Sequence, residues 1–527
     1  MRRAAILLLL ASWPAFAAPR RPAPLDTALI GEVTAAALDF MAPRTLQAVP
    51  VPTMALWGLQ GLGALDPFLV PSLAAGGLTG PKQVVALHLR TTPLHLLLAQ
   101  AAPPEADMAG WGTTIAAMTQ AGWAASPALR AAGTQRILDA FFAELFSHFD
   151  PYSRYEPPAE AQADRARRFG EAGVGLGVAH VGGGFAVTSV QAGSPAAEGG
   201  VRAGDLILAI DGQSTQQSDL GAINTLLSGP QDSQVALTLR APHGPARTVT
   251  LTRVLIPPET VTARRAGRML VLRISSFSQD TASRLAQELI RGLGGGPDAP
   301  PEGVVIDLRG NRGGVLQQSV AAVAMLQGTG IVAQTEGRDP RAGHVFLANG
   351  RDLAEGLPVV VLVDGNTASA AEIMAAALAD QRRAVVVGSA TLGKGLVQTV
   401  VTLPDAGELF VTWSRVLAPL GWPIQGLGVL PQVCTSLGPQ VLARELHALA
   451  DGRQLAQLAL TAARAARAPL APARALAIRD TCPSASGRDA DLGAARFLID
   501  TPRAYQQALL RIGGGQDGLT PPPPIPH

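Results

Sequence analysis

A serine and a lysine, Ser369 and Lys394, could together form a nucleophilic site that needs no histidine. Ser369 lies where an apolar run typical of a buried strand, residues 358–363, gives way to an alanine-rich helical pattern, residues 368–379. A hydroxyl at a helix start lies near unpaired backbone N–H groups and the positive end of the helix dipole, which can stabilise an oxyanion during acyl transfer. An ordinary N-cap serine is the alternative interpretation.

Lys394 supplies the base that such a serine requires. It lies between two glycines and follows a second apolar run, residues 384–387. Surrounding Val and Leu side chains could desolvate the amine, and burial lowers the pKa of a lysine from about 10.4 toward a value at which it accepts a proton. Gln398 lies four residues further along an expected strand, so it should share a face with Lys394 and orient the amine.

A glycine-rich loop is the candidate oxyanion hole. Residues 310–314 end one apolar strand and open a helical pattern, as the Ser369 segment does, and glycines let backbone approach a substrate closely. We expect the N–H of Gly313 or Gly314 to act together with the N–H of Ala370. A tight β–α turn with no further role is the alternative.

One competing motif predicts different chemistry. Residues 388–394 satisfy most of a phosphate-binding loop, G-x-x-x-x-G-K. However, Gly395 stands where magnesium coordination needs Ser or Thr, and residues 396–403 are typical of a strand instead of a phosphate-cradling helix. We therefore expect no nucleotide.

Composition excludes several other classes. The 527 residues are 47% hydrophobic, which is enough for about three domains with their own cores. The 42 basic and 40 acidic residues balance and form no basic stripe, so we expect no nucleic-acid partner. The eight histidines show no metal-ligand spacing, so we expect no metal and no cofactor.

Further motifs give the chain a family resemblance. Ser369 lies in T-A-S-A-A-E-I, Lys394 follows 25 positions later in T-L-G-K-G, and Gln398 ends L-V-Q. Other ordered motifs are F-D-P-Y-S-R-Y at 149–155, D-L-R-G-N-R-G-G at 307–314 and G-L-G-V-L-P at 426–431. On these residues the chain resembles the carboxy-terminal processing (tail-specific) serine proteases. The resemblance implies a Ser-Lys dyad supported by Gln, on a core of the crotonase/Clp-protease-like type.

Shifts in the pattern divide the chain into regions, and the expected fold class is α/β and multidomain. A helical N-terminal region is expected at 18–157. A mostly β region at 171–255 is similar to a bacterial PDZ domain. Alternating strands and helices at 256–435 indicate an α/β protease core. Helical patterns continue through 436–515, and a proline-rich tail at 516–527 should be disordered.

The PDZ-like region suggests how a protein tail would bind. The backbone of Gly175, Leu176 and Gly177 would offer N–H groups to a terminal carboxylate while a strand edge pairs with the peptide. An apolar wall is expected to accept the last side chain, and it comprises Leu220, Ile223 and Leu227. The expected partners are therefore proteins with exposed C-terminal tails. An adaptor protein and peripheral contact with a membrane are also left open.

The N-terminus and the cysteines predict the compartment. Residues 1–17 reproduce the charged, apolar and small-residue zones of a cleaved signal peptide, and no apolar run is long enough for a transmembrane span. Cys434 and Cys482, the only cysteines, are expected to form a disulfide, with two buried thiols as the alternative. A periplasmic or secreted protein is expected, and an uncleaved anchor would face the same compartment.

Two function classes stay open from the sequence. The first is an exported serine endopeptidase that binds C-terminal tails. The second is a catalytically silent PDZ scaffold or chaperone on the same fold, which would hold peptides without cleaving them. Retention of Ser369, Lys394 and Gln398 together favours the enzyme.

Overall fold

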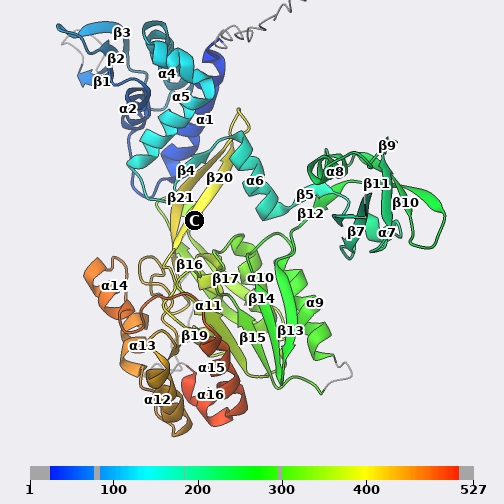
Figure 1. Cartoon of the computed structure of the whole chain (residues 1–527). Coiled ribbons are helices and arrows are strands. Elements are labelled where there is room, and N and C mark those ends of the chain that lie inside the picture. The colour runs from blue at the N-terminus through cyan, green and yellow to red at the C-terminus, as the bar shows by residue number, and fades with distance from the viewer. Residues whose placement is uncertain (1–23, 76–82, 183, 295–298, 510–527) are drawn as a thin grey trace, which may run out of the picture. The chain divides into compact units, whose positions relative to one another are not determined.

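The computed structural model describes residues 24–75, 83–182, 184–294 and 299–509, which form two compact units (Figure 1). The first comprises the described residues through 42, residues 48–157 and residues 401–409, and the second comprises the rest. The signal peptide expected at 1–17 and the tail expected at 516–527 lie outside the described residues. None of the helices in the described part of the chain combines the length and apolar character that crossing a bilayer requires.

The first unit is mainly helical but also contains a small antiparallel sheet of order β1-β2-β3. Its elements are α1 (Thr27–Arg44), α2 (Val51–Gln60), α3 (Leu62–Leu65), β1 (Leu69–Ala75), β2 (Gln83–Leu89), β3 (His95–Ala101), α4 (Met108–Ala125), α5 (Pro127–Ser147) and β4 (Arg154–Glu156). The region expected to be helical therefore also contains strands. Pro71 lies within β1, where an edge strand tolerates a missing N–H.

The second unit begins with α6 (Pro158–Phe169) and a β-rich part. Its antiparallel sheet has the order β11-β10-β8-β7-β6, with β9 paired to β8, while β5 pairs with β12. Alternate residues of β10 are buried, and α8 adds Ile223 and Leu227 to the same core. The elements are β5 (Glu171–Gly173), β6 (Leu176–Val181), β7 (Gly184–Val190), α7 (Pro195–Glu198), β8 (Leu206–Ile210), β9 (Gln213–Ser214), α8 (Leu220–Leu227), β10 (Gln234–Arg240), β11 (Ala246–Thr252) and β12 (Val254–Ile256).

A six-stranded sheet of order β13-β14-β15-β18-β19-β22 forms the centre of the α/β part. All its pairs are parallel except β13 with β14. The valine-rich strands β15, β18 and β19 are buried throughout, which is typical of a parallel sheet covered on both faces. The strands are β13 (Val261–Ala266), β14 (Met269–Ile274), β15 (Gly303–Asp307), β18 (Val359–Val363), β19 (Val385–Gly388) and β22 (Val433–Cys434).

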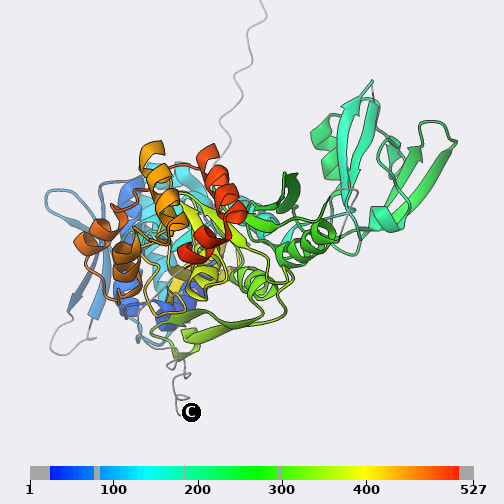
Figure 2. The same ribbon diagram turned by 90° about the horizontal axis from the view of Figure 1, so that it is seen from below.

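Helices cover both faces of this sheet, as Figures 1 and 2 show. Alternate residues of β18 belong to different cores: Val361 packs with α9, α10 and α11, whereas Val360 packs with α12, α15 and α16. The fold class is therefore α/β, as the sequence predicts. The helices are α9 (Thr281–Leu293), α10 (Leu316–Gln327), α11 (Ala370–Asp380), α12 (Pro439–Ala450), α13 (Gln457–Arg464), α14 (Pro472–Arg479), α15 (Asp489–Asp500) and α16 (Pro502–Ala508).

A second sheet and the C-terminal helices complete this part. The sheet has the order β17-β16-β21-β20. At the end of α11, Asp380 accepts hydrogen bonds from Arg464 of α13 at 3.1 Å and from the Trp422 indole at 2.7 Å, all buried. The C-terminal helices therefore pack as part of the α/β core. The remaining elements are β16 (Thr329–Glu336), η1 (Pro340–Ala342), β17 (His344–Asn349), β20 (Leu396–Thr402) and β21 (Glu408–Leu417).

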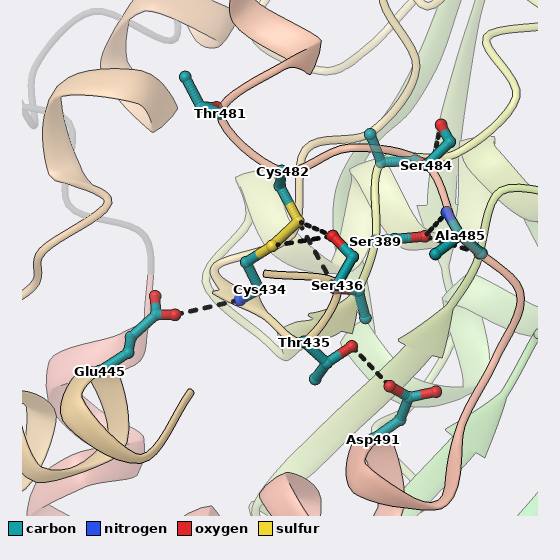
Figure 3. The surroundings of a disulfide bond; sticks show 12 residues. Ser389, Cys434, Thr435, Ser436, Glu445, Thr481, Cys482, Ser484, Ala485 and Asp491 are labelled. Atoms are coloured by element: carbon teal, nitrogen blue, oxygen red, sulfur yellow. Dashed lines mark hydrogen bonds between the residues drawn. A yellow bond between two sulfur atoms is a disulfide. The ribbon is translucent and has the colours of Figure 1, made fainter. Parts of the chain in front are cut away.

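A disulfide and a buried carboxyl lie where α12 meets β22 (Figure 3). Cys434 is bonded to Cys482, and the Cys434 N–H donates to Glu445 at 3.3 Å. Glu445 is 5% exposed, and burial raises the pKa of its carboxyl from 4.5 to about 7. A raised carboxyl pKa means that the folded state binds the proton more tightly than the unfolded chain does. The contribution of Glu445 protonation to the free energy of unfolding is therefore fully present below pH 4.5 and is lost as pH rises through 7.

Replacing Glu445 by glutamine should remove that pH dependence. The variant Glu445→Gln is expected to raise the free energy of unfolding at pH 8 by about 2–3 kcal/mol, because no buried charge forms, and to change it little at pH 4. Urea unfolding at both pH values measures the difference. The exposed Glu160→Gln variant is the control, and an equal response of the two variants would contradict the buried-carboxyl explanation.

Candidate active site

Ser369 occupies the turn between β18 and α11. Its backbone has φ 58° and ψ −122°, a left-handed conformation that is uncommon for a residue with a side chain. Such a conformation persists only where neighbouring contacts hold it, and it is frequent at active sites. The side chain is half-buried, and the residue directly precedes a helix whose eleven residues are all buried.

The Asp364 carboxylate holds this turn. Its Oδ1 accepts hydrogen bonds from the N–H groups of Asn366 and Thr367, each at 3.0 Å. The same oxygen accepts the Gly310 N–H, also at 3.0 Å, from the loop that follows β15. The serine turn and the glycine-rich loop are therefore fastened to each other by one side chain.

The Glu372 side chain, in the first turn of α11, joins the serine turn to the lysine loop. It is 0% exposed. Its Oε2 accepts the N–H groups of Ser369 and Lys394, both at 2.8 Å. Its Oε1 accepts the Gly393 N–H at 2.7 Å and the Thr391 hydroxyl. One carboxyl group therefore fixes the backbone of both residues that the sequence predicts as catalytic.

Burial raises the pKa of the Glu372 carboxyl, and the hydrogen bonds from Thr391, Gly393, Ser369 and Lys394 oppose that rise. Glu372 lies in the T-A-S-A-A-E-I motif, from which no role was predicted for it. A signal was present, because a serine followed three residues later by glutamate at a helix start is the pattern of a capping box.

Lys394 is half-buried in the loop between β19 and β20. Glycine is required on both sides of it. Gly393 has φ +87°, and a Cβ on Gly395 would lie 2.2 Å from the Gln425 backbone nitrogen. The loop is therefore close-packed around the lysine.

Gln398 lies near this loop, but not for the reason that the sequence analysis gave. Strand β20 begins at Leu396, so Lys394 precedes the strand and the shared-face argument does not apply. The Gln398 Nε2 donates to Leu396 O at 3.1 Å and to Thr412 Oγ1 at 3.0 Å. These two bonds use the two N–H groups of the amide.

The glycine-rich loop lies against the serine turn, because a Cβ on Gly313 would be 2.7 Å from the Ser369 Cβ and 3.0 Å from the Ala370 nitrogen. The Gly313 N–H, however, donates to Asn311 Oδ1 at 2.8 Å. Gly313 therefore does not offer its N–H to an oxyanion here, which corrects one expectation. Gly314 and Ala370 remain the candidate donors.

A pocket of about 610 Å³ lies between α6 and the β-rich part. Gly175, Leu176, Gly177 and Leu227 line it, as the sequence analysis expects. Two other expected wall residues do not: Ile223 is 0% exposed within the core of this part, and Leu220 is 44% exposed and does not line this pocket. The polar Asn224 and Ser228 also line the pocket.

Comparisons with known proteins agree with these features. A profile of peptidase family S41 matches residues 268–435, and a PDZ-domain profile matches residues 186–241. The C-terminal processing peptidase of Tetradesmus obliquus chloroplasts is 35% identical over 324 residues, which cover 57% of this chain and 68% of that protein. The chain belongs to the carboxy-terminal processing protease family.

Other members of this carboxy-terminal processing protease family are similar over the same extent. The Bartonella bacilliformis carboxy-terminal-processing protease is 32% identical over 302 residues, covering 57% of this chain and 69% of that protein. A solved structure of a photosystem II D1 C-terminal processing protease has 32% sequence identity, covers 57% of this chain and 81% of that chain, and has a TM-score of 0.33. The protein is a serine-type endopeptidase with a PDZ domain.

Proposed function

We propose that this protein is an exported endopeptidase that captures the C-terminal tails of proteins and hydrolyses peptide bonds with Ser369 as nucleophile and Lys394 as general base. The observation that carries the proposal is the Glu372 Oε2 atom, which accepts the N–H groups of both residues at 2.8 Å. Two segments that share one carboxylate oxygen are held side by side, which is the first requirement for a nucleophile and its base.

The lysine content of the chain supports the role of Lys394. Lys82 and Lys394 are the only lysines in the sequence, and all other residues among its 42 basic ones are arginines. An arginine stays protonated at any pH the protein meets and cannot take a proton from serine. The chain uses arginine at all other basic positions except Lys82. A lysine in the loop that Glu372 binds is therefore consistent with a role as a general base.

In the proposed reaction, the Lys394 amine takes the proton of Ser369 as its Oγ attacks the peptide carbonyl carbon. The N–H groups of Gly314 and Ala370 stabilise the oxyanion. The Lys394 ammonium then gives its proton to the leaving amine, and the acyl-enzyme remains. Water, deprotonated by Lys394, attacks the ester, the Lys394 ammonium returns that proton to Ser369 Oγ, and the new carboxyl end is released.

Gln398 supports the amine in this scheme. Its Nε2 already donates to Leu396 O and Thr412 Oγ1, so its remaining polar atom, Oε1, can only accept. An acceptor beside Lys394 would orient the amine without competing for the serine proton.

Tail capture is assigned to the pocket of the PDZ domain. Residues 175–177 and Leu227 all line this pocket. Exposed backbone N–H groups suit a terminal carboxylate, and an apolar side chain suits the last residue of a tail. Export rests on the signal-like residues 1–17 and on the Cys434–Cys482 disulfide, a bond that persists in oxidising compartments.

Cleavage of a tailed substrate tests the proposal. The full mature chain is mixed with an unstructured protein ending in apolar residues, and mass spectrometry follows the fragments. We expect fragments from the unmutated protein and none from Ser369→Ala, while the exposed Ser283→Ala variant cleaves normally. An amidated tail should bind more weakly than a free carboxylate, because the charge that the loop N–H groups bind is gone.

The opposite result would support a scaffold. If the unmutated protein bound the tail and left it intact, the catalytic part of the proposal would be wrong and the binding part would stand. Equal binding of amidated and free tails would remove the role assigned to Gly175–Gly177.

A further inference from the structure

The segment from the last residue of α14 to the first turn of α15, residues 479–491, lies against the loops that hold the proposed catalytic residues. We name residues 479–491 the C-terminal strap. It lies beyond residue 435, where the S41 family match ends, so nothing in that match assigns it a role. The Cys434–Cys482 disulfide ties its beginning to β22, the strand next to β19 (Figure 3).

The strap makes its densest set of hydrogen bonds with the residues just before Lys394. The Ala485 N–H donates to Ser389 Oγ, and that hydroxyl donates to Ala485 O, both at 3.0 Å. The Ser484 hydroxyl donates to Ala390 O at 2.8 Å, and the Ala390 N–H donates to Cys482 O at 3.2 Å. Both polar groups of the Ala390 backbone are therefore bonded to the strap.

Arg479 extends this contact toward Lys394. Its Nη1 donates to Thr391 O at 2.8 Å and to Leu427 O at 2.9 Å, and its Nη2 donates to Ser484 Oγ at 2.9 Å. Thr391 is also the residue whose hydroxyl donates to Glu372. Burial lowers the pKa of the Arg479 guanidinium, and the charge of Glu372 opposes this change, which is consistent with the two side chains lying near each other.

The strap also reaches the other two loops of the site. At the serine turn, the Gly365 N–H donates to Ala485 O at 2.8 Å, and the Gly487 N–H donates to Asp364 Oδ2 at 3.1 Å. At the start of the glycine-rich loop, Arg309 donates to Arg488 O at 2.7 Å. One segment of thirteen residues thus contacts all three loops.

We propose that the C-terminal strap is a positioning element for the protease site and that Arg479 is its central positioning residue. Arg479 would hold the Thr391 and Leu427 carbonyls so that the lysine loop keeps the backbone path in which Glu372 binds it. Arg479 touches no reacting atom in this scheme and acts through the loop. The proposal rests on the proposed function, because it assigns the strap to the Ser369–Lys394 reaction.

Variants of the full chain test this role. We expect Arg479→Ala to lower kcat about 10- to 100-fold with KM changed less than about threefold, because the lysine loop shifts while the PDZ pocket is intact. Arg479→Lys should recover part of the loss, since one ammonium can hold one carbonyl but not both. Arg474→Ala, at an exposed position on the same helix, should behave as the unmutated enzyme.

Hydrogen–deuterium exchange gives a readout that does not depend on activity. In Arg479→Ala, amides of residues 389–395 should exchange faster, and those of β10 in the PDZ domain should not. Ser484→Ala provides a second variant at an exposed position, where folding is not at risk, and it should show a smaller change of the same kind.

The outcomes separate the two proposals. If the unmutated protein cleaves and Arg479→Ala cleaves equally well with unchanged exchange in residues 389–395, the strap proposal is wrong. If the unmutated protein does not cleave at all, the proposed function is wrong, and exchange alone then decides whether the strap holds the loop. A loss of kcat with a general rise in exchange across the second unit would also overturn the positioning role in favour of overall stability.

Discussion

Lys394→Ala is expected to lower kcat for tail cleavage by about 10³–10⁴-fold, with binding of the tail unchanged. The Ser369 hydroxyl is a weak nucleophile without a base, and loss of a general base typically removes this much rate. Lys394→Arg should be equally inactive, because it keeps the positive charge and cannot accept a proton. Initial rates on the tailed substrate, with binding measured separately, give the result.

The scarcity of lysine makes the proposed protonation state directly measurable. When the lysine side chains are isotopically labelled, NMR should show two amine signals. In the Lys82→Arg variant only the Lys394 signal should remain. A base must be neutral to work, so the rate should rise with pH as the amine loses its proton, and the NMR titration should follow the same curve. A rate that is flat from pH 5 to 9, or full activity in Lys394→Arg, would contradict a lysine base.

Glu372→Ala is expected to damage both stability and activity. Three backbone N–H groups and the Thr391 hydroxyl lose their acceptor, the Glu372 side chain, which is 0% exposed. Buried donors left without acceptors destabilise by about 1–3 kcal/mol each, and because such effects do not add fully we expect about 3–5 kcal/mol in total. The kcat should fall at least about 100-fold, since the serine and lysine segments lose their common anchor.

Two variants sharpen this test. Glu372→Gln keeps the shape but turns an amide NH₂ toward N–H donors, so it should be impaired almost as much as the alanine variant. Glu288→Ala, on α9, removes a surface ion pair with Arg291 and should change stability by less than about 1 kcal/mol. Urea unfolding and cleavage rates measure both effects. Near-normal stability and rate in Glu372→Gln would show that the carboxylate is not the anchor.

Local patterns were enough to predict where Ser369 and Lys394 lie in the fold. The apolar runs at 358–363 and 384–387 match β18 and β19 within a residue or so, because strands buried on both faces are continuous apolar runs. The alanine-rich pattern likewise matches α11, whose close packing explains its small residues. These elements are determined by residues that are close together in the sequence, so a single sequence is sufficient to predict them.

Contacts between distant segments were not predictable in the same way. The shared face expected for Lys394 and Gln398 required the strand pattern at 396–403 to extend back to Lys394, whereas β20 begins at Leu396. The Gly313 N–H donates to the Asn311 side chain and not to an oxyanion, and no sequence pattern predicts this hydrogen bond. The strap contacts join backbone groups, serine hydroxyls and the side chains of Arg479, Arg309 and Asp364 over long sequence separations, and such contacts leave no periodic signal.

The position of the C-terminal strap in the chain has a consequence for when the protein becomes active. Ser369 precedes Cys482 by 113 positions and Lys394 precedes it by 88. During translation, Ser369 and Lys394 are therefore synthesised well before the C-terminal strap that contacts their loops. An unfinished or truncated polypeptide is expected to be harmless to the proteins around it, and proteolytic competence should arrive only with the completed, oxidised molecule.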